Sequence, residues 1–222
     1  MTTNNLEHLT QRLLDWYETQ AWAAELEALT PLVLSELACC EPVDVARIAA
    51  RTGMTASDVL GRLRGSPAEW GHDGRLLGFG LTLRATRHRF EVDGRVLYTW
   101  CAPDALAFPA VLGIEAHVES PCFATGEPIR IHVGPEGVRS VEPAGAVVSI
   151  VTPAADLSDF RRALCREQHF FSSRRAASQW QAAHPEGIVV SVADAFTLTR
   201  RLFASWIQAA GQAQDGPISE PA

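Results

Sequence analysis

Lysine is absent from this sequence: all 19 residues counted as Lys or Arg are arginine, against 26 acidic residues, and the formal net charge is −7. A general nucleic-acid-binding protein usually presents a basic face to the phosphates. This charge balance therefore argues against nucleic acid as a partner. The first residues also lack a basic start followed by an apolar core, so we expect no secretory signal peptide.

Long apolar runs are absent as well. The longest mostly apolar stretch, residues 105–114, is too short to span a bilayer and contains Pro109. Hydrophobic residues make up 47% of the chain and charged residues 20%, which is ordinary for a folded soluble protein. We therefore expect a cytoplasmic protein with no membrane partner.

Cysteine is sparse, and its pattern excludes several common uses. The five cysteines are an odd number, which does not indicate a disulfide framework. They form no Cys-x-x-Cys pair and no His/Cys set with zinc spacing, and no glycine-rich phosphate loop appears. In a reducing cytoplasm these thiols are expected to stay free for chemistry.

The first part of the chain reads as helical. Gly53 suits the end of one short helix and Thr55 the start of the next, which together predict a helix-turn-helix. A hairpin turn at Asp73-Gly74 follows. We predict a winged-helix-like domain over residues 1–81. Its eleven acidic residues through Gly80 against six arginines favour a structural or lid role over DNA reading.

The second part, residues 82–222, is mixed. Asp93-Gly94 predicts another hairpin between alternating segments. Further strands and helices are expected here, which together indicate an α+β fold with a second domain of antiparallel sheets flanked by helices. The expected strands cover residues 129–133, 138–141, 146–151 and 188–192, and the expected helices cover residues 157–164 and 194–210.

Cys101 and Asp104 form the most informative local pattern. A strand is expected to end at Trp100, and Pro103 suits the first residue of a helix. Cys101 then lies at a helix N-terminus, where the dipole should lower the thiol pKa below its usual value of about 8.5. Asp104 lies on the same side, and its charge favours a proton shared with the sulfur. Spacing alone favours a structural role for both residues.

The remaining cysteines and one histidine admit several interpretations. Cys165, taken alone, is an ordinary buried thiol, and Cys122 is expected to be structural. The adjacent pair Cys39-Cys40 offers a possible thiophilic site, although packing at a helix end is the favoured explanation. His169 with Cys101 would make a thiol hydrolase, in which a His169→Ala variant is inactive and esters are hydrolysed.

At these residues the chain resembles the organomercurial (alkylmercury) lyases. The similarity includes the run Leu-Tyr-Thr-Trp-Cys-Ala-Pro-Asp that ends at Asp104, and it extends in family order over much of the chain. The matching segments are residues 78–84, 97–104, 108–110, 124–128, 141–145, Cys165, residues 169–171 and 188–192. Some members carry a second cysteine directly after the position of Cys165, where this chain has Arg166.

The resemblance implies a function in mercury detoxification, by protonolysis of carbon–mercury bonds to a hydrocarbon and Hg(II). It assigns the chemistry and mercury binding to Cys101, Asp104 and Cys165. No permanent cofactor is implied, since mercury enters as substrate and leaves as product. The implied partners are an organomercurial, small-molecule thiols and a mercuric reductase that receives the metal. Mercury is soft and prefers thiolate ligands, which agrees with this residue set.

A metal-responsive transcription regulator is the main alternative function. It would use the winged helix to bind DNA and the cysteines to sense metal, and mercury-dependent gel shifts would reveal it. The lyase instead predicts that Asp104→Ala loses protonolysis while mercury still binds through sulfur. We also expect Trp100 and the apolar residues after Asp104 to line a dry pocket for the organic group.

Overall fold

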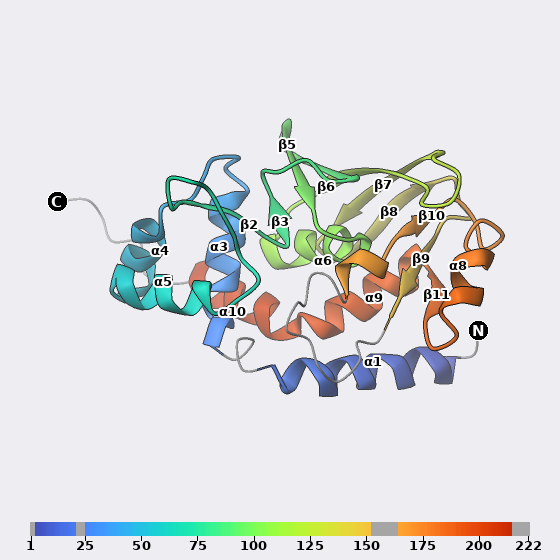
Figure 1. Ribbon diagram of the computed structural model, residues 1–222, viewed down its shortest axis with the longest axis horizontal. Coiled ribbons are helices and arrows are strands. Elements are labelled where there is room, and N and C mark those ends of the chain that lie inside the picture. Colours follow the sequence, from blue (N-terminus) through green and yellow to red (C-terminus); the bar gives the residue numbers. More distant parts are fainter. Residues whose placement is uncertain (1–2, 21–24, 152–163, 215–222) are drawn as a thin grey trace.

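The computed structural model describes residues 3–20, 25–151 and 164–214, and within them the fold is α+β, as predicted. Two antiparallel sheets pack with helices, most of which lie on one side of the larger sheet (Figure 1). Among the described residues, no helix combines the length and apolarity that a membrane crossing requires.

The N-terminal part contains the predicted helix-turn-helix. Asp44 caps the first of its helices by accepting from the backbone of Ala46, and Gly53 ends that helix with a left-handed φ of 70°. Thr55 caps the second helix by accepting from the backbone of Asp58. The helix end at Gly53 and the cap at Thr55 confirm the expectations from the sequence, whereas the Asp44 cap was not predicted. The helices of this part are α1 (Thr3–Glu18), α3 (Thr30–Leu37), α4 (Val45–Thr52) and α5 (Ala56–Arg64).

The larger sheet has eight strands in the order β1-β2-β3-β5-β4-β6-β7-β8. Both predicted hairpins occur in it. The Asp93-Gly94 turn has positive φ at both residues, 48° and 74°, as a tight two-residue hairpin requires. The strands are β1 (Glu69–Trp70), β2 (Leu76–Phe79), β3 (Leu81–Thr82), β4 (His88–Val92), β5 (Arg95–Thr99), β6 (Ala116–Pro121), β7 (Pro128–Gly134) and β8 (Gly137–Glu142).

This sheet runs across the predicted domain boundary. The boundary after residue 81 falls inside β3, which pairs with β2 on one side and with β5 on the other. The hairpin of the N-terminal part therefore extends the sheet of the second part. The division into two domains stays a prediction.

The smaller sheet has three strands in the order β10-β9-β11. Its strands are β9 (Val147–Ile150), β10 (Phe170–Phe171) and β11 (Ile188–Ser191). The 3-10 turn η1 (Cys165–Glu167), α8 (Ser178–Ala183) and α9 (Val192–Leu202) lie around it. Helix α10 (Ala204–Gln214) follows α9 and packs against α3 and α6. The single helix expected over residues 194–210 is thus two helices that meet at Phe203. Of the helix expected at residues 157–164, residues 157–163 lie outside the described part.

Helix α6 (Ala102–Leu112) lies at the centre of the molecule. Ten of its eleven residues are buried, because it packs against the larger sheet on one side and against α9 and α10 on the other. A helix that is apolar all round needs such a place. Helix α1 packs along α9, on the outside of this layer (Figure 1).

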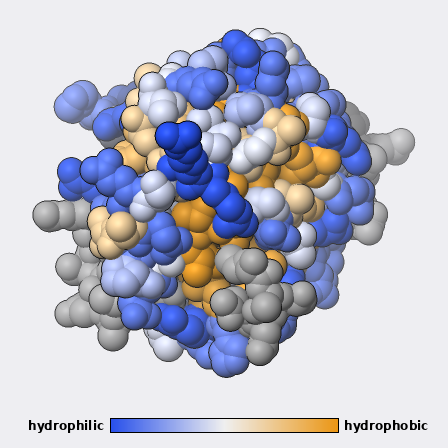
Figure 2. Space-filling view, turned by 90° about the vertical axis from the view of Figure 1, so that its right-hand side faces the viewer, coloured by the Kyte–Doolittle hydropathy of each residue, from blue (hydrophilic) through white to orange (hydrophobic). Residues whose placement is uncertain are grey.

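The apolar interior reaches the surface at one end of the molecule. Figure 2 looks onto the end that carries α8 and β11, where apolar residues occupy a strip bordered by hydrophilic ones. The exposed large hydrophobic side chains among the described residues are Val96 and Phe123. Phe123 is covered on one side by the Arg87 guanidinium, which lies 4.8 Å from the ring centroid.

Candidate active site

Cys101 lies where β5 leads into α6. It is the N-cap residue of α6, in an extended conformation with φ −146° and ψ 172°, and it is 3% exposed. The helix begins at Ala102, one residue earlier than Pro103 predicted. Asp104 falls in the first turn of the helix, as expected. The sequence therefore places a thiol and a carboxylate together at the start of a buried helix.

Cys165 joins this pair from a distant part of the chain. It begins the 3-10 turn η1 and is 6% exposed. The sulfurs of Cys101 and Cys165 and a carboxylate oxygen of Asp104 all lie within 4.8 Å of one another. Within the described residues this is the one group of three such side chains close enough to hold a metal ion. Trp100 packs against both cysteines.

The protonation of Cys101 differs from the expectation. Burial raises the pKa of its thiol well above the usual range, and the side chains of Cys165 and Asp104 raise the pKa further. A hydrogen bond from the Asp104 backbone N–H opposes these effects without outweighing them. The predicted lowering of the pKa is therefore wrong, because the loss of hydration of a buried thiolate exceeds the effect of the helix N-terminus. Before a soft metal arrives, Cys101 is held as a thiol.

These three side chains open into a cavity of about 70 Å³ with an almost wholly apolar lining. Trp100 and Phe108 line it, as predicted. The sequence interpretation missed the walls that other elements supply. They are Leu13, Trp16 and Tyr17 from α1, Phe79 and Gly80 from the larger sheet, Ile150 from β9, Leu198, Thr199 and Leu202 from α9, and Phe203 and Trp206 beyond it.

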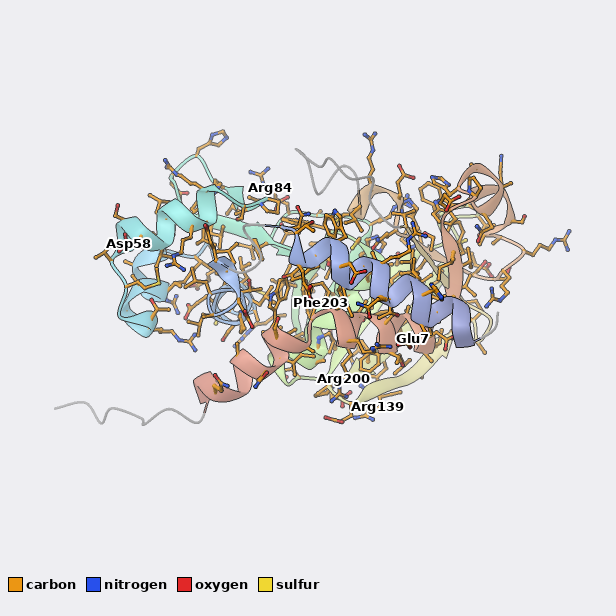
Figure 3. All side chains as sticks on the ribbon, turned by 90° about the horizontal axis from the view of Figure 1, so that it is seen from below. Glu7, Asp58, Arg84, Arg139, Arg200 and Phe203 are labelled. Atoms are coloured by element: carbon orange, nitrogen blue, oxygen red, sulfur yellow. The ribbon has the colours of Figure 1, made fainter. Side chains whose placement is uncertain are left out.

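Aromatic side chains make up much of this lining. The Tyr17 ring meets Phe203 edge-on at 6.3 Å and Trp206 at 6.0 Å. Phe79 lies 6.3 Å from Trp100 and 6.4 Å from Trp206. In Figure 3, α1 lies across the front, with Phe203 beside it where α9 passes into α10. The apolar spacing of α1 and of residues 194–210 predicted that these helices have a buried face. It did not predict that this face lines the cavity.

Helix α1 packs through Leu9 and Leu13 into the core, and an exposed ion pair also joins it to α9. Arg201 of α9 donates two hydrogen bonds to the Glu7 carboxylate, at 2.7 and 2.9 Å. The Arg201 guanidinium lowers the pKa of Glu7, which keeps the carboxylate charged. Figure 3 shows Glu7 on α1, on the side of the helix that faces α9.

The other sequence candidates lie outside the cavity lining. His169 stacks on Phe123 with ring centroids 3.7 Å apart, and burial lowers its pKa to about 4. Cys122 is buried, and its sulfur accepts a hydrogen bond from the Ser172 N–H at 3.3 Å. Cys39 is exposed and Cys40 is half-buried at the end of α3. All five cysteines are free thiols, as expected.

Comparison with known proteins points to one family. The family model described as alkylmercury lyase matches residues 81–204. An alkylmercury lyase of Staphylococcus epidermidis is 45% identical over 203 residues, covering 91% of this chain and 93% of the relative. The alkylmercury lyase of Streptomyces lividans is 47% identical over 197 residues, covering 88% and 91%.

A solved structure shares the fold. The crystal structure of the mercury-bound form of MerB2 aligns with a TM-score of 0.74 and 21% identity, and covers 88% of this chain and 99% of that one. The family model spans more than half of the chain, and the two relatives span nearly all of it. This chain therefore belongs to the alkylmercury lyase family, enzymes that cleave the carbon–mercury bond.

Proposed function

We propose that Cys101, Asp104 and Cys165 carry out carbon–mercury bond protonolysis in this enzyme, with both sulfurs as mercury ligands and the carboxyl group as the proton carrier. The observation that carries the proposal is the approach of the two sulfurs and a carboxylate oxygen to within 4.8 Å inside a buried apolar cavity. Thiolates are the ligands that a soft metal prefers. A carboxyl group beside them can take up and return a proton.

The reaction begins with capture of the organomercurial R–Hg–X. The Cys101 sulfur bonds to mercury, X leaves, and the thiol proton passes to Asp104. Cys165 then bonds to the same mercury, and its thiol proton joins the released X to give HX, while Asp104 keeps the proton from Cys101. Two sulfur donors push electron density through mercury onto the carbon, which becomes basic enough to accept a proton. The carbon–mercury bond breaks and a carbon–hydrogen bond forms.

The atoms balance without an external reagent. Two thiols and R–Hg–X give R–H, HX and mercury held by two thiolates, and mercury stays in the +2 state throughout. The side chains and the substrate therefore suffice for the proposed reaction. Small-molecule thiols, or a mercuric reductase, would take the product by exchange of sulfur ligands. Because this chemistry needs free thiols, we place it in the cytoplasm.

We also propose that the N-terminal part is a winged-helix-like unit with a structural role. Its α4–α5 pair and β1–β2 hairpin have the required order. Its α1 lends Leu13, Trp16 and Tyr17 to the cavity wall. The acidic balance of this part supports a role in enclosing the substrate instead of binding phosphates.

The test separates mercury capture from protonolysis. Wild-type protein incubated with phenylmercury and excess thiol should release benzene. Asp104→Asn should bind phenylmercury through sulfur yet release benzene at least about 100-fold more slowly, because a positioned proton donor typically contributes 10²–10⁴-fold. Cys101→Ser and Cys165→Ser should lose most activity as well.

Cys39→Ser provides the matched control, since this thiol is exposed and lies outside the cluster. It should keep wild-type activity. Benzene release by Asp104→Asn at the wild-type rate, measured by gas chromatography, would contradict the assigned role of the carboxyl group. Failure of the wild type with titratable free thiols would refute the proposed reaction.

A further inference from the structure

Gln168 contacts Cys101 and lies three residues after Cys165, and it has no role in the proposed reaction. Its side chain is buried, with 4% of the residue exposed, and it lines the cavity. The Cys101 thiol donates a hydrogen bond to the Gln168 Oε1 atom over 3.9 Å. The Ala102 backbone N–H, next to Cys101, donates to the Gln168 backbone carbonyl at 3.3 Å. Side chain and backbone of one residue thus hold the start of α6.

The other end of the amide is anchored on the smaller sheet. Gln168 Nε2 donates to the Val151 carbonyl at 3.5 Å, just beyond the end of β9. A backbone carbonyl accepts hydrogen bonds and cannot donate them, so the amide nitrogen must face Val151. The amide oxygen is therefore left to face Cys101.

The segment that carries Cys165 is fastened to the same strand. The buried Ser149 hydroxyl donates to the Glu167 carbonyl at 3.0 Å and accepts from the His169 N–H at 2.9 Å. The Ser149 N–H donates to the His169 carbonyl at 3.0 Å. These bonds lie on either side of Gln168, two to four residues after Cys165. They make β9 a common support for Cys165 and for the amide that contacts Cys101.

We propose that Gln168 is a positioning residue for carbon–mercury cleavage, which aims the Cys101 sulfur at mercury and holds it in register with Cys165. The inference rests on the proposed function of the two cysteines. The contact with the amide oxygen orients the Cys101 side chain beside Cys165, the other side chain that forms a hydrogen bond with its thiol. The backbone bond to Ala102 keeps the two sulfurs at a separation that one mercury atom can bridge.

An amide side chain suits this position better than an apolar side chain or a carboxylate would. An apolar side chain offers no acceptor for the thiol hydrogen. A carboxylate would add a second negative charge beside Asp104 and would lose the donor that Val151 requires. A neutral group with one acceptor and one donor end satisfies both contacts.

Gln168→Met tests the inference, because it keeps the length of the side chain and removes both polar ends. We expect kcat for phenylmercury to fall about tenfold, which corresponds to about 1.4 kcal/mol of activation free energy and is of the size expected for one oriented hydrogen bond. KM should change less than threefold, since the apolar walls that hold the organic group are untouched. Titration with Hg(II) should show weaker retention of the sulfur–mercury charge-transfer absorption against a competing thiol.

Gln181→Met is the matched control. Gln181 also spans two backbone carbonyls, those of His184 and Gly187, but it lies on α8 outside the cavity lining. It should leave kcat and mercury retention unchanged. Gln168→Asn keeps the amide group on a side chain that is too short to reach both Val151 and Cys101. This variant provides the test if Gln168→Met does not fold. Its kcat should fall like that of Gln168→Met.

The inference is overturned if both Gln168 variants retain wild-type kcat and mercury absorption. It is also overturned if their losses merely follow a lowered melting temperature, with KM and kcat changing together. An inactive wild type would instead count against the proposed function of the cysteines. The two failures are therefore distinguishable.

Discussion

At the scale of single residues, two opposing effects act on the protonation of the Cys101 thiol. The N-terminal position of Cys101 on α6 favours a thiolate, whereas burial and the nearby Cys165 and Asp104 favour a thiol, and the thiol form prevails. A thiol at rest suits the proposed reaction, in which the proton released from Cys101 when mercury binds is the proton that the carbon receives. The Cys101-Asp104 spacing pointed to this shared proton, although the direction of the pKa was wrong.

Gly80 shows a second residue-scale constraint, at the wall of the cavity. It has φ +73°, and a Cβ atom there would lie 2.5 Å from the Phe108 ring. Gly80→Ala should destabilise the fold by about 2–4 kcal/mol, from the left-handed conformation and from overpacking. It should also displace Phe108 and alter KM for the organomercurial.

Gly113→Ala is the control for this change, because Gly113 has a similar φ of +69° with open space around the added methyl group. It should cost only the conformational part, about 1–2 kcal/mol. Urea unfolding measures both variants. Equal losses of unfolding free energy in the two variants would show that the contact with Phe108 does not contribute to the effect of Gly80→Ala.

At the scale of elements, the turn between α4 and α5 depended on local signals, whereas the break between α9 and α10 did not. Gly53 ends α4 and Thr55 caps α5, as the sequence indicated. By contrast, the apolar stripe of residues 194–210 predicted one helix, and the structure has α9 and α10 with a break at Phe203. Phe203 and Trp206 then both reach the cavity. The apolar repeat in a sequence does not reveal a break between two helices when the apolar face continues across the break.

The start of α9 offers an element-scale prediction. The Ser191 hydroxyl accepts from the Asp194 N–H at 3.0 Å and donates to the Asp194 carboxylate at 2.7 Å. Ser191→Ala should lower the free energy of unfolding by about 1 kcal/mol. The melting temperature should fall by roughly 2–4 °C for a chain of this size.

Ser191→Asp should recover most of this loss, because aspartate is also a strong N-cap. Differential scanning calorimetry measures the three proteins. A melting temperature of Ser191→Ala equal to the wild type would show that α9 begins without help from this cap. Activity should be retained in both variants, since Ser191 is not part of the cavity lining.

At the scale of the whole molecule, buried histidines tie stability to pH. His88 and His169 are buried, and burial lowers the pKa of His88 to about 3 and that of His169 to about 4. Unfolded histidine titrates at about 6.5. Between these values the unfolded chain binds protons that the folded chain does not, so the free energy of unfolding falls as pH falls below about 6.5.

His169→Asn tests this linkage. Each pH unit within the window costs about 1.4 kcal/mol for each such group. The wild type should therefore lose about 1–2 kcal/mol more than the variant between pH 7 and pH 5. Urea unfolding at the two pH values provides the comparison. The same loss in both proteins would mean that His169 is protonated in the fold, and the variant should keep lyase activity, unlike in a Cys101/His169 hydrolase.

Much of the architecture was predictable because its signals are local. The helix-turn-helix, both hairpins and four further strands follow from caps, turn residues and alternation over a few positions. Strands β3, β6 and β10 were missed. The two-residue strands β3 and β10 are too short for periodicity to register. Strand β6 does alternate between buried and more exposed residues, so a local signal for it was present in the sequence.

The sequence by itself determined the α+β class, the family, and the placement of Cys101 and Asp104 at one helix start, because neighbouring residues and their order suffice for these. The resemblance already grouped Cys165 with these two residues, but only the tertiary structure shows its sulfur beside them. Only the structure, too, decided that α1 and α10 close the cavity and that the Cys101 thiol keeps its proton. Those features depend on contacts between segments far apart in the chain and on the exclusion of water that such contacts create, neither of which is written in any local pattern.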